Sequence, residues 1–141
     1  IYTYNSKNKM TKLELGGFVI RYTYNNKDKM IHSESIFEGT LVSTLEYEYD
    51  ANGFPKHSLS ITSIPESVQS ISETTIEYLN GNPVKYTTYL YNSASAGKGD
   101  PLVSTIIYDD KKNPYNTIHT GTEIPMKNNG IEYNYVNDPE S

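Results

Sequence analysis

The chain has 141 residues and a formal net charge of −5, with 12 basic against 17 acidic side chains. This length favours one domain with its own core, so we expect residues 1–141 to fold as a single unit. The acidic balance argues against the basic stripe of nucleic-acid-binding proteins, and we expect no nucleic-acid partner. Cysteine is absent, which excludes disulfides and thiolate chemistry.

The aromatic composition is unusual, with fourteen Tyr, three Phe and no Trp. A buried Tyr ring contributes as much apolar area as Phe, but its hydroxyl needs a partner or water. Such side chains suit a thin layer in which rings lie on a sheet. No stretch approaches the ~18 apolar residues of a membrane-spanning helix, so we expect no membrane span in this chain.

A tyrosine-rich strand-and-turn unit recurs along the whole chain. Clear copies occupy residues 1–5, 20–25 and 45–50, with weaker copies at 76–78, 106–109 and 131–135. Each clear copy ends in Tyr followed by Asn or Asp, and a Met or Pro comes six residues after several of these tyrosines, at Met10, Met30, Pro55 and Pro114. A repeat of this length sets the architecture, and each copy is typical of one β-hairpin.

Alternation of polar and apolar residues divides each copy into two faces. The tyrosines expected to be buried on one face are Tyr22, Tyr24, Tyr47, Tyr49, Tyr133 and Tyr135. The glutamates expected on the opposite, solvated face are Glu46, Glu48, Glu77 and Glu132. Residues 102–108 carry apolar side chains on both faces, which predicts a central or covered strand.

Turn signals separate the strands. Asn52-Gly53 and Asn80-Gly81 are expected to form two-residue type I′ turns, and Gly16-Gly17 and Glu38-Gly39 similar ones. Residues 92–101 form the longest expected loop, with no residue apparent that could anchor it. No segment has helical periodicity. The sequence therefore predicts an all-β antiparallel meander of about ten strands, strongly curved into an open or incomplete barrel.

No catalytic constellation is readable. His32, His57 and His119 lack metal-ligand spacing, and the sequence contains neither a Gly-x-Ser-x-Gly elbow nor a phosphate-binding loop. The strand glutamates recur at equivalent repeat positions, as expected for a solvated sheet face. We therefore expect no catalytic residues, no metal site and no cofactor.

Some tyrosines depart from the regular alternation, and these mark the most promising ligand surface. They are Tyr86, Tyr89, Tyr91 and Tyr115. The first three straddle both faces of one expected strand, so at least one ring should be exposed. Exposed tyrosines provide rigid contact area at low entropic cost, which suits recognition of a glycan or a protein.

Residues 49–55 and 108–114 resemble the tyrosine–aspartate (YD/RHS-type) hairpin repeats of bacterial surface and toxin-shell proteins. The combination of Ile/Leu-x-Tyr-x-Tyr-Asn/Asp strands, Asn-Gly turns and trailing Pro resembles more closely a family of uncharacterised Bacteroidales lipoproteins with a porin-like, strongly curved sheet. This resemblance implies export to the periplasm or cell surface through a lipidated Cys upstream of this chain. It implies no known activity. The chain also begins inside a repeat, as expected for part of a longer precursor.

Three functions are open at this point. The leading expectation is a non-enzymatic exported or cell-surface domain with a binding or scaffolding role. The first alternative is a glycan-binding module that uses exposed tyrosines. The second alternative is a hydrolase whose site is built from loops.

Overall fold

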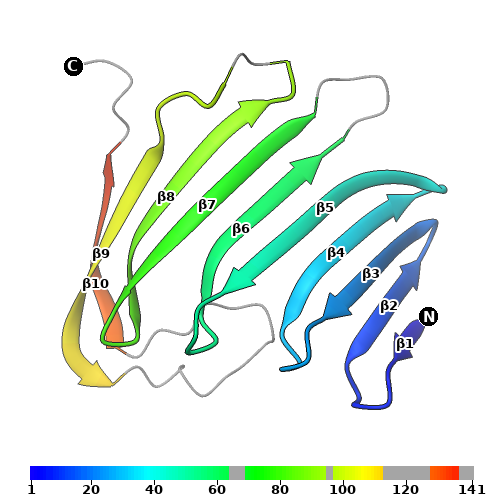
Figure 1. Ribbon diagram of the computed structural model, residues 1–141, viewed down its shortest axis with the longest axis horizontal. Helices are drawn as coiled ribbons and strands as arrows, with labels where there is room; N and C mark the ends of the chain where they lie inside the picture. The colour runs from blue at the N-terminus through cyan, green and yellow to red at the C-terminus, as the bar shows by residue number, and fades with distance from the viewer. Residues whose placement is uncertain (64–68, 95–96, 113–127, 137–141) are drawn as a thin grey trace.

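The computed structural model describes residues 1–63, 69–94, 97–112 and 128–136, with the backbone alone for residues 109–112 and 128–136. The described residues form one antiparallel sheet whose ten strands follow one another in chain order (Figure 1). The strands are β1 (Tyr2–Tyr4), β2 (Met10–Leu15), β3 (Phe18–Tyr24), β4 (Met30–Phe37), β5 (Thr40–Tyr49), β6 (Pro55–Thr62), β7 (Ser70–Leu79), β8 (Asn82–Asn92), β9 (Leu102–Lys112) and β10 (Asn128–Val136).

The all-β antiparallel meander predicted from the sequence is confirmed. Among the described residues every strand pairs only with its neighbours in the chain, and β1 and β10 are not paired with each other, so the sheet is open. Figure 1 shows that it is also curved. The described ranges contain no helix, and therefore no helix that could cross a membrane.

The hairpins at one end of the sheet share a turn built on the Asn or Asp that follows the repeated Tyr. Asn5 Oδ1 accepts hydrogen bonds from the backbone N–H groups of Lys7 and Lys9, both at 3.0 Å. Asn25 repeats this pattern in the β3–β4 turn, and Asp50 accepts from the Phe54 N–H at 2.8 Å in the β5–β6 turn. A side-chain oxygen thus holds each turn closed.

The prediction of a type I′ turn at Asn52-Gly53 is wrong. Only Gly53 has a positive φ, 83°, whereas type I′ needs positive φ at both central residues. The Asp50 side chain instead closes a longer turn that ends with Gly53 in the left-handed conformation. Both residues do have positive φ in Gly16-Gly17, Glu38-Gly39 and Asn80-Gly81, as predicted.

A β-bulge follows each of these Asn or Asp turns and sets the register. Tyr49 pairs with Pro55 while Glu48 pairs with His57, which leaves Lys56 as the extra residue. The same one-residue shift occurs beside the pairs Tyr4–Met10, Tyr24–Met30 and Tyr78–Pro83. Because side chains alternate between faces, each extra residue moves the remaining residues of its own strand to the other face.

In four units the last Tyr hydrogen-bonds across to the preceding hairpin. The hydroxyl donates to the backbone carbonyl of the Met or Pro at, or next to, the start of the neighbouring strand. These bonds, here called the tyrosine ladder, are Tyr24–Met10 (2.8 Å), Tyr49–Met30 (2.6 Å), Tyr78–Pro55 (2.8 Å) and Tyr108–Pro83 (2.7 Å). The six-residue spacing of Tyr and Met or Pro has a different origin, because Tyr4–Met10, Tyr24–Met30 and Tyr49–Pro55 are the residues that pair across the same hairpin.

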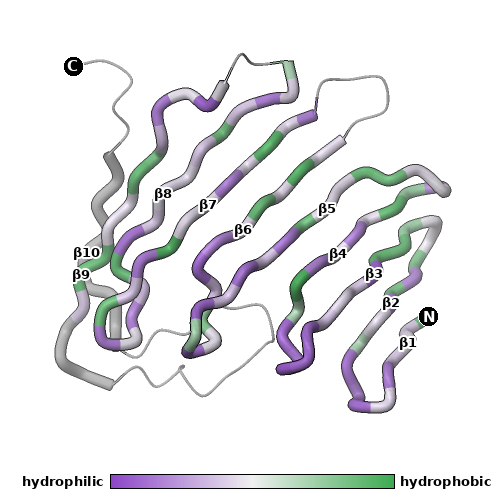
Figure 2. Tube along the Cα trace, viewed as in Figure 1, coloured by the Kyte–Doolittle hydropathy of each residue, from purple (hydrophilic) through white to green (hydrophobic). Residues whose placement is uncertain are grey.

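The register defines two faces of the sheet. The tyrosine face carries the ladder, and the charged face carries ion pairs such as Arg21–Glu34 and Lys85–Glu77. Leu59 and Ile61, which pair with Glu46 and Thr44, lie on the charged face. Hydrophobic and hydrophilic residues therefore alternate along the strands instead of forming long runs (Figure 2).

Burial is shallower than the sequence predicted. Tyr22, Tyr47 and Tyr49 do lie on the face opposite the glutamates, but each is only half-buried. The reason is that the described strands form a single layer, and no second layer among the described residues covers the rings. Within the described part, Met30, Ile76 and Ile106 are the buried residues of the hydrophobic core, Pro83 is fully buried, and Pro55 is also buried. Of Tyr133 and Tyr135 only the backbone is described, in β10.

The tyrosine ladder predicts a loss of stability at alkaline pH. Burial raises the pKa of Tyr24, Tyr49 and Tyr78 above the usual value of 10.0. The unfolded chain therefore releases these protons first, and stability that is fully present below pH ~10 declines as pH rises above it. Urea unfolding between about pH 9 and pH 11 should show a smaller decline in Tyr78→Phe than in wild type. Equal declines would contradict this.

Candidate ligand site on the charged face

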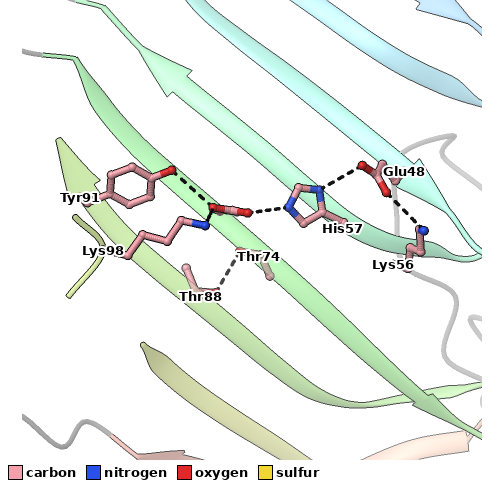
Figure 3. A network of polar contacts seen from close by, with 8 residues as sticks. Glu48, Lys56, His57, Thr74, Thr88, Tyr91 and Lys98 are labelled. Atoms are coloured by element: carbon pink, nitrogen blue, oxygen red, sulfur yellow. Dashed lines mark hydrogen bonds and ion pairs between the residues drawn. The ribbon is translucent and has the colours of Figure 1, made fainter. Parts of the chain in front are cut away.

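Glu73 is the centre of a polar network on the charged face. It lies in the middle of β7, where it pairs with Leu59 of β6 and Tyr89 of β8. One carboxylate oxygen, Oε1, is 3.1 Å from Nε2 of His57. The other, Oε2, accepts from the Tyr91 hydroxyl at 3.4 Å and forms an ion pair with Nζ of Lys98 (Figure 3).

Lys98 comes from the loop between β8 and β9 and lies over two rings of the sheet. Its Nζ is 5.4 Å from the Tyr89 ring centroid and 5.8 Å from that of Tyr91. Both distances lie within the range of cation–π attraction. Tyr89 and Tyr91 are two residues apart on one strand, so their rings project from the same face. The ammonium is thus held by one carboxylate and two aromatic rings.

The network continues through His57 to the next strand. Its Nδ1 lies 4.0 Å from Oε1 of Glu48, and Oε2 of Glu48 lies 3.3 Å from Nζ of Lys56 (Figure 3). His57 therefore lies between two carboxylates from β5 and β7. His32 has a similar place in β4, 3.7 Å from Glu34 and 3.6 Å from Glu46. Carboxylates thus flank both histidines. His32 and Glu34 lie two residues apart on one strand, so the sequence alone could have paired them, whereas both contacts of His57 cross between strands.

The electrostatics of the site favour ions. The hydrogen bonds from Lys98 and then His57 hold the pKa of Glu73 below its usual value. The same contact with Glu73 raises the pKa of Lys98. Glu73 is therefore an anion, and Lys98 a cation, at neutral pH. The Glu73 side chain retains 22% exposure, so solvent reaches the site.

The structure places the predicted ligand-surface tyrosines on opposite faces. Tyr86 pairs with Ile76 and Ser104 on the tyrosine face and is half-buried. Tyr89 and Tyr91 lie together on the charged face, also half-buried. Tyr115 lies outside the described residues. The predicted straddling of two faces is confirmed, but the expectation of at least one exposed ring is wrong, since Tyr86, Tyr89 and Tyr91 are all half-buried. Of these three tyrosines, only Tyr89 and Tyr91 belong to the network.

The expectation that nothing anchors the loop over residues 92–101 is wrong. Lys98 joins this loop to Glu73, and Asn92 Oδ1 accepts from the Ala94 N–H at 3.0 Å. The sequence gives no signal for this lysine, because its neighbours are the small residues Gly97 and Gly99. Its partner is distant in the sequence, and only the pairing of β7 with β8 brings the two together.

Within the ranges that the structure describes, no group of three or more His, Asp or Glu side chains is arranged to hold a metal ion. His119 lies outside those ranges. The site is therefore an arrangement of aromatic rings and charged groups. No protein-family model matches the sequence, and no curated protein matches it significantly.

Proposed function

We propose that this chain is a non-enzymatic domain of an exported or cell-surface protein with a binding or scaffolding role. Its ligand surface is formed by Tyr89 and Tyr91 together with the charged groups around Glu73. The observation that carries the proposal is the pair of rings on one strand face beside a solvent-accessible carboxylate. Such a surface combines stacking area with hydrogen-bonding groups.

The state of Glu73 argues against one catalytic role. A catalytic acid needs a carboxyl whose pKa is raised, so that it holds a proton near neutral pH. The pKa of Glu73 is shifted in the opposite direction by Lys98 and His57. Glu73 is therefore unsuited to the role of catalytic acid, and a hydrolase with a loop-built site stays the second alternative.

The placement outside the cell is supported by the resemblance of the hairpin repeat to exported bacterial proteins. Under this proposal a lipid anchor lies upstream of the chain, in a porin-like lipoprotein of the Bacteroidales type. The single-layer sheet with a repeated hairpin unit is compatible with such an architecture. Localising an epitope-tagged full-length precursor by membrane fractionation tests this part. Recovery in the cytoplasmic fraction alone would overturn it.

Glycan binding is the second candidate function. It is favoured by the two aromatic rings that lie beside Glu73 and His57. We expect the domain to show no turnover on a panel of hydrolase substrates. A glycan that the wild type captures on a glycan array should not be captured by the double variant Tyr89→Ala/Tyr91→Ala. The matched control is Tyr4→Ala, which removes a 53%-exposed ring on the edge strand β1.

Two results would contradict the proposal. Glycan capture that persists in the double variant would show that the surface is elsewhere. Turnover that is abolished by Glu73→Gln or His57→Ala would show that the domain is an enzyme.

A further inference from the structure

Lys98 occupies its site in the way that a bound ligand would. It comes from a loop, reaches the face of the sheet from outside, and places an ammonium against Glu73 and two tyrosine rings. The three groups that receive it lie on paired strands, β7 and β8, whose register fixes their positions without any help from the loop. The receiving site therefore exists independently of Lys98.

The receiving groups have the chemistry that recognises an ammonium ion. A carboxylate supplies a charge-assisted hydrogen bond, and ring faces attract a cation through their quadrupoles. The bound lysine is flanked by Gly97 and Gly99, so its side chain provides the contacts. The Lys98 side chain remains 44% exposed, and ion pairs with this much exposure are weak and easily exchanged.

We propose that the Tyr89–Tyr91–Glu73 site binds a lysine side chain of a partner protein, and that Lys98 occupies this site until the partner's lysine displaces it. This inference rests on the proposed function and specifies the ligand class of the same surface. Charge favours such a partner, because the chain has a net charge of −5 and would attract a basic surface. Lys98 thus inhibits binding of the partner by occupying the same site.

Competition between Lys98 and the partner's lysine has a measurable consequence. When a site is available for only part of the time, the apparent dissociation constant equals the intrinsic one divided by the available fraction. Under this proposal the closed state is the major one, so the open fraction of wild type is below about one half. Removing Lys98 should therefore tighten binding of an external lysine by at least about twofold.

The experiment uses the whole domain and the peptide N-acetyl-Gly-Lys-Gly-amide, which reproduces the sequence around Lys98. The peptide is titrated into wild type and Lys98→Gln while the ring signals of Tyr89 and Tyr91 are followed by NMR. The half-saturating concentration should fall by at least about twofold in the variant. The same peptide with Gln in place of Lys should leave the ring signals unchanged.

Lys85→Gln is the matched control. It removes one positive charge from the same face, since Lys85 pairs with Glu77 at 2.8 Å, but no ring contact of Lys85 is found among the described residues. We expect it to bind the peptide as wild type does. In Lys98→Gln, the further change Glu73→Gln should weaken binding again.

The inference is overturned if Lys98→Gln binds the peptide no more tightly than wild type, because Lys98 would then only pin its loop. It is also overturned if Lys85→Gln tightens binding equally, since net charge alone would explain the result. Either outcome leaves the broader proposal standing if glycan capture still requires Tyr89 and Tyr91. Loss of that requirement as well would overturn both.

Discussion

Replacing Tyr78 with Ala is expected to destabilise the domain by about 3 kcal/mol, at the low end of buried aromatic truncations because the ring is half-buried. Tyr78 is a central member of the tyrosine ladder. Its ring stacks on Phe54 with centroids 5.1 Å apart, and its hydroxyl donates to the carbonyl of Pro55 at 2.8 Å. The variant loses both contacts. The measurement is the free energy of unfolding in urea at neutral pH.

The conservative change Tyr78→Phe isolates the ladder hydrogen bond. It keeps the ring but leaves the Pro55 carbonyl without this donor, and Pro55 is buried. A buried acceptor that loses its partner costs about 1–3 kcal/mol. The control is Tyr47→Phe, because the Tyr47 ring lies on the same face but has no hydroxyl hydrogen bond among the described residues. We expect the control to change stability by about 0.5 kcal/mol or less.

Equal costs for the two Phe variants would show that the ladder does not stabilise the sheet.

The hairpin organisation was predictable because its signals are local. Strand alternation and the Asn-Gly and Gly-Gly turns lie within a few residues of one another, and they correctly predict a meander of about ten strands. The faces of the even-numbered strands were harder to predict. One bulge residue after a turn, such as Lys56, exchanges the faces on which the later residues of its strand lie. Leu59 and Ile61 consequently lie beside His57 on the charged face. Composition carries no sign of such an insertion.

The candidate site was only half predictable for a similar reason. Counting along β8 separates Tyr86 from Tyr89 and Tyr91, because alternation is a local rule. The contact of Glu73 with Lys98 depends on how the loop between β8 and β9 returns over the sheet. A lysine between two glycines has no local preference that would indicate this path. Ion pairs across a sheet become visible only when the register is known.

Ile106 and Ile107 provide the second large expected effect, since they test directly which face of the sheet forms the core. They are neighbours in β9, where the sequence predicted a central or covered strand. The structure pairs β9 on both sides, as a central strand is, but β9 is the last strand but one and its two faces are unequally buried: Ile106 is 7% exposed and Ile107 47% exposed. Ile106 lies on the tyrosine face, on the same side as Tyr108, and Ile107 lies on the charged face.

Ile106→Ala should therefore cost about 2–4 kcal/mol, whereas Ile107→Ala should cost about 1 kcal/mol or less. Both changes remove the same atoms and the same β-branched preference for a strand from one element, so those contributions cancel in the difference. What remains is the burial of one face relative to the other. Urea unfolding of the two variants measures it. A cost for Ile107→Ala that matches that of Ile106→Ala would mean that the charged face is covered at β9 and that the sheet has a core on both sides.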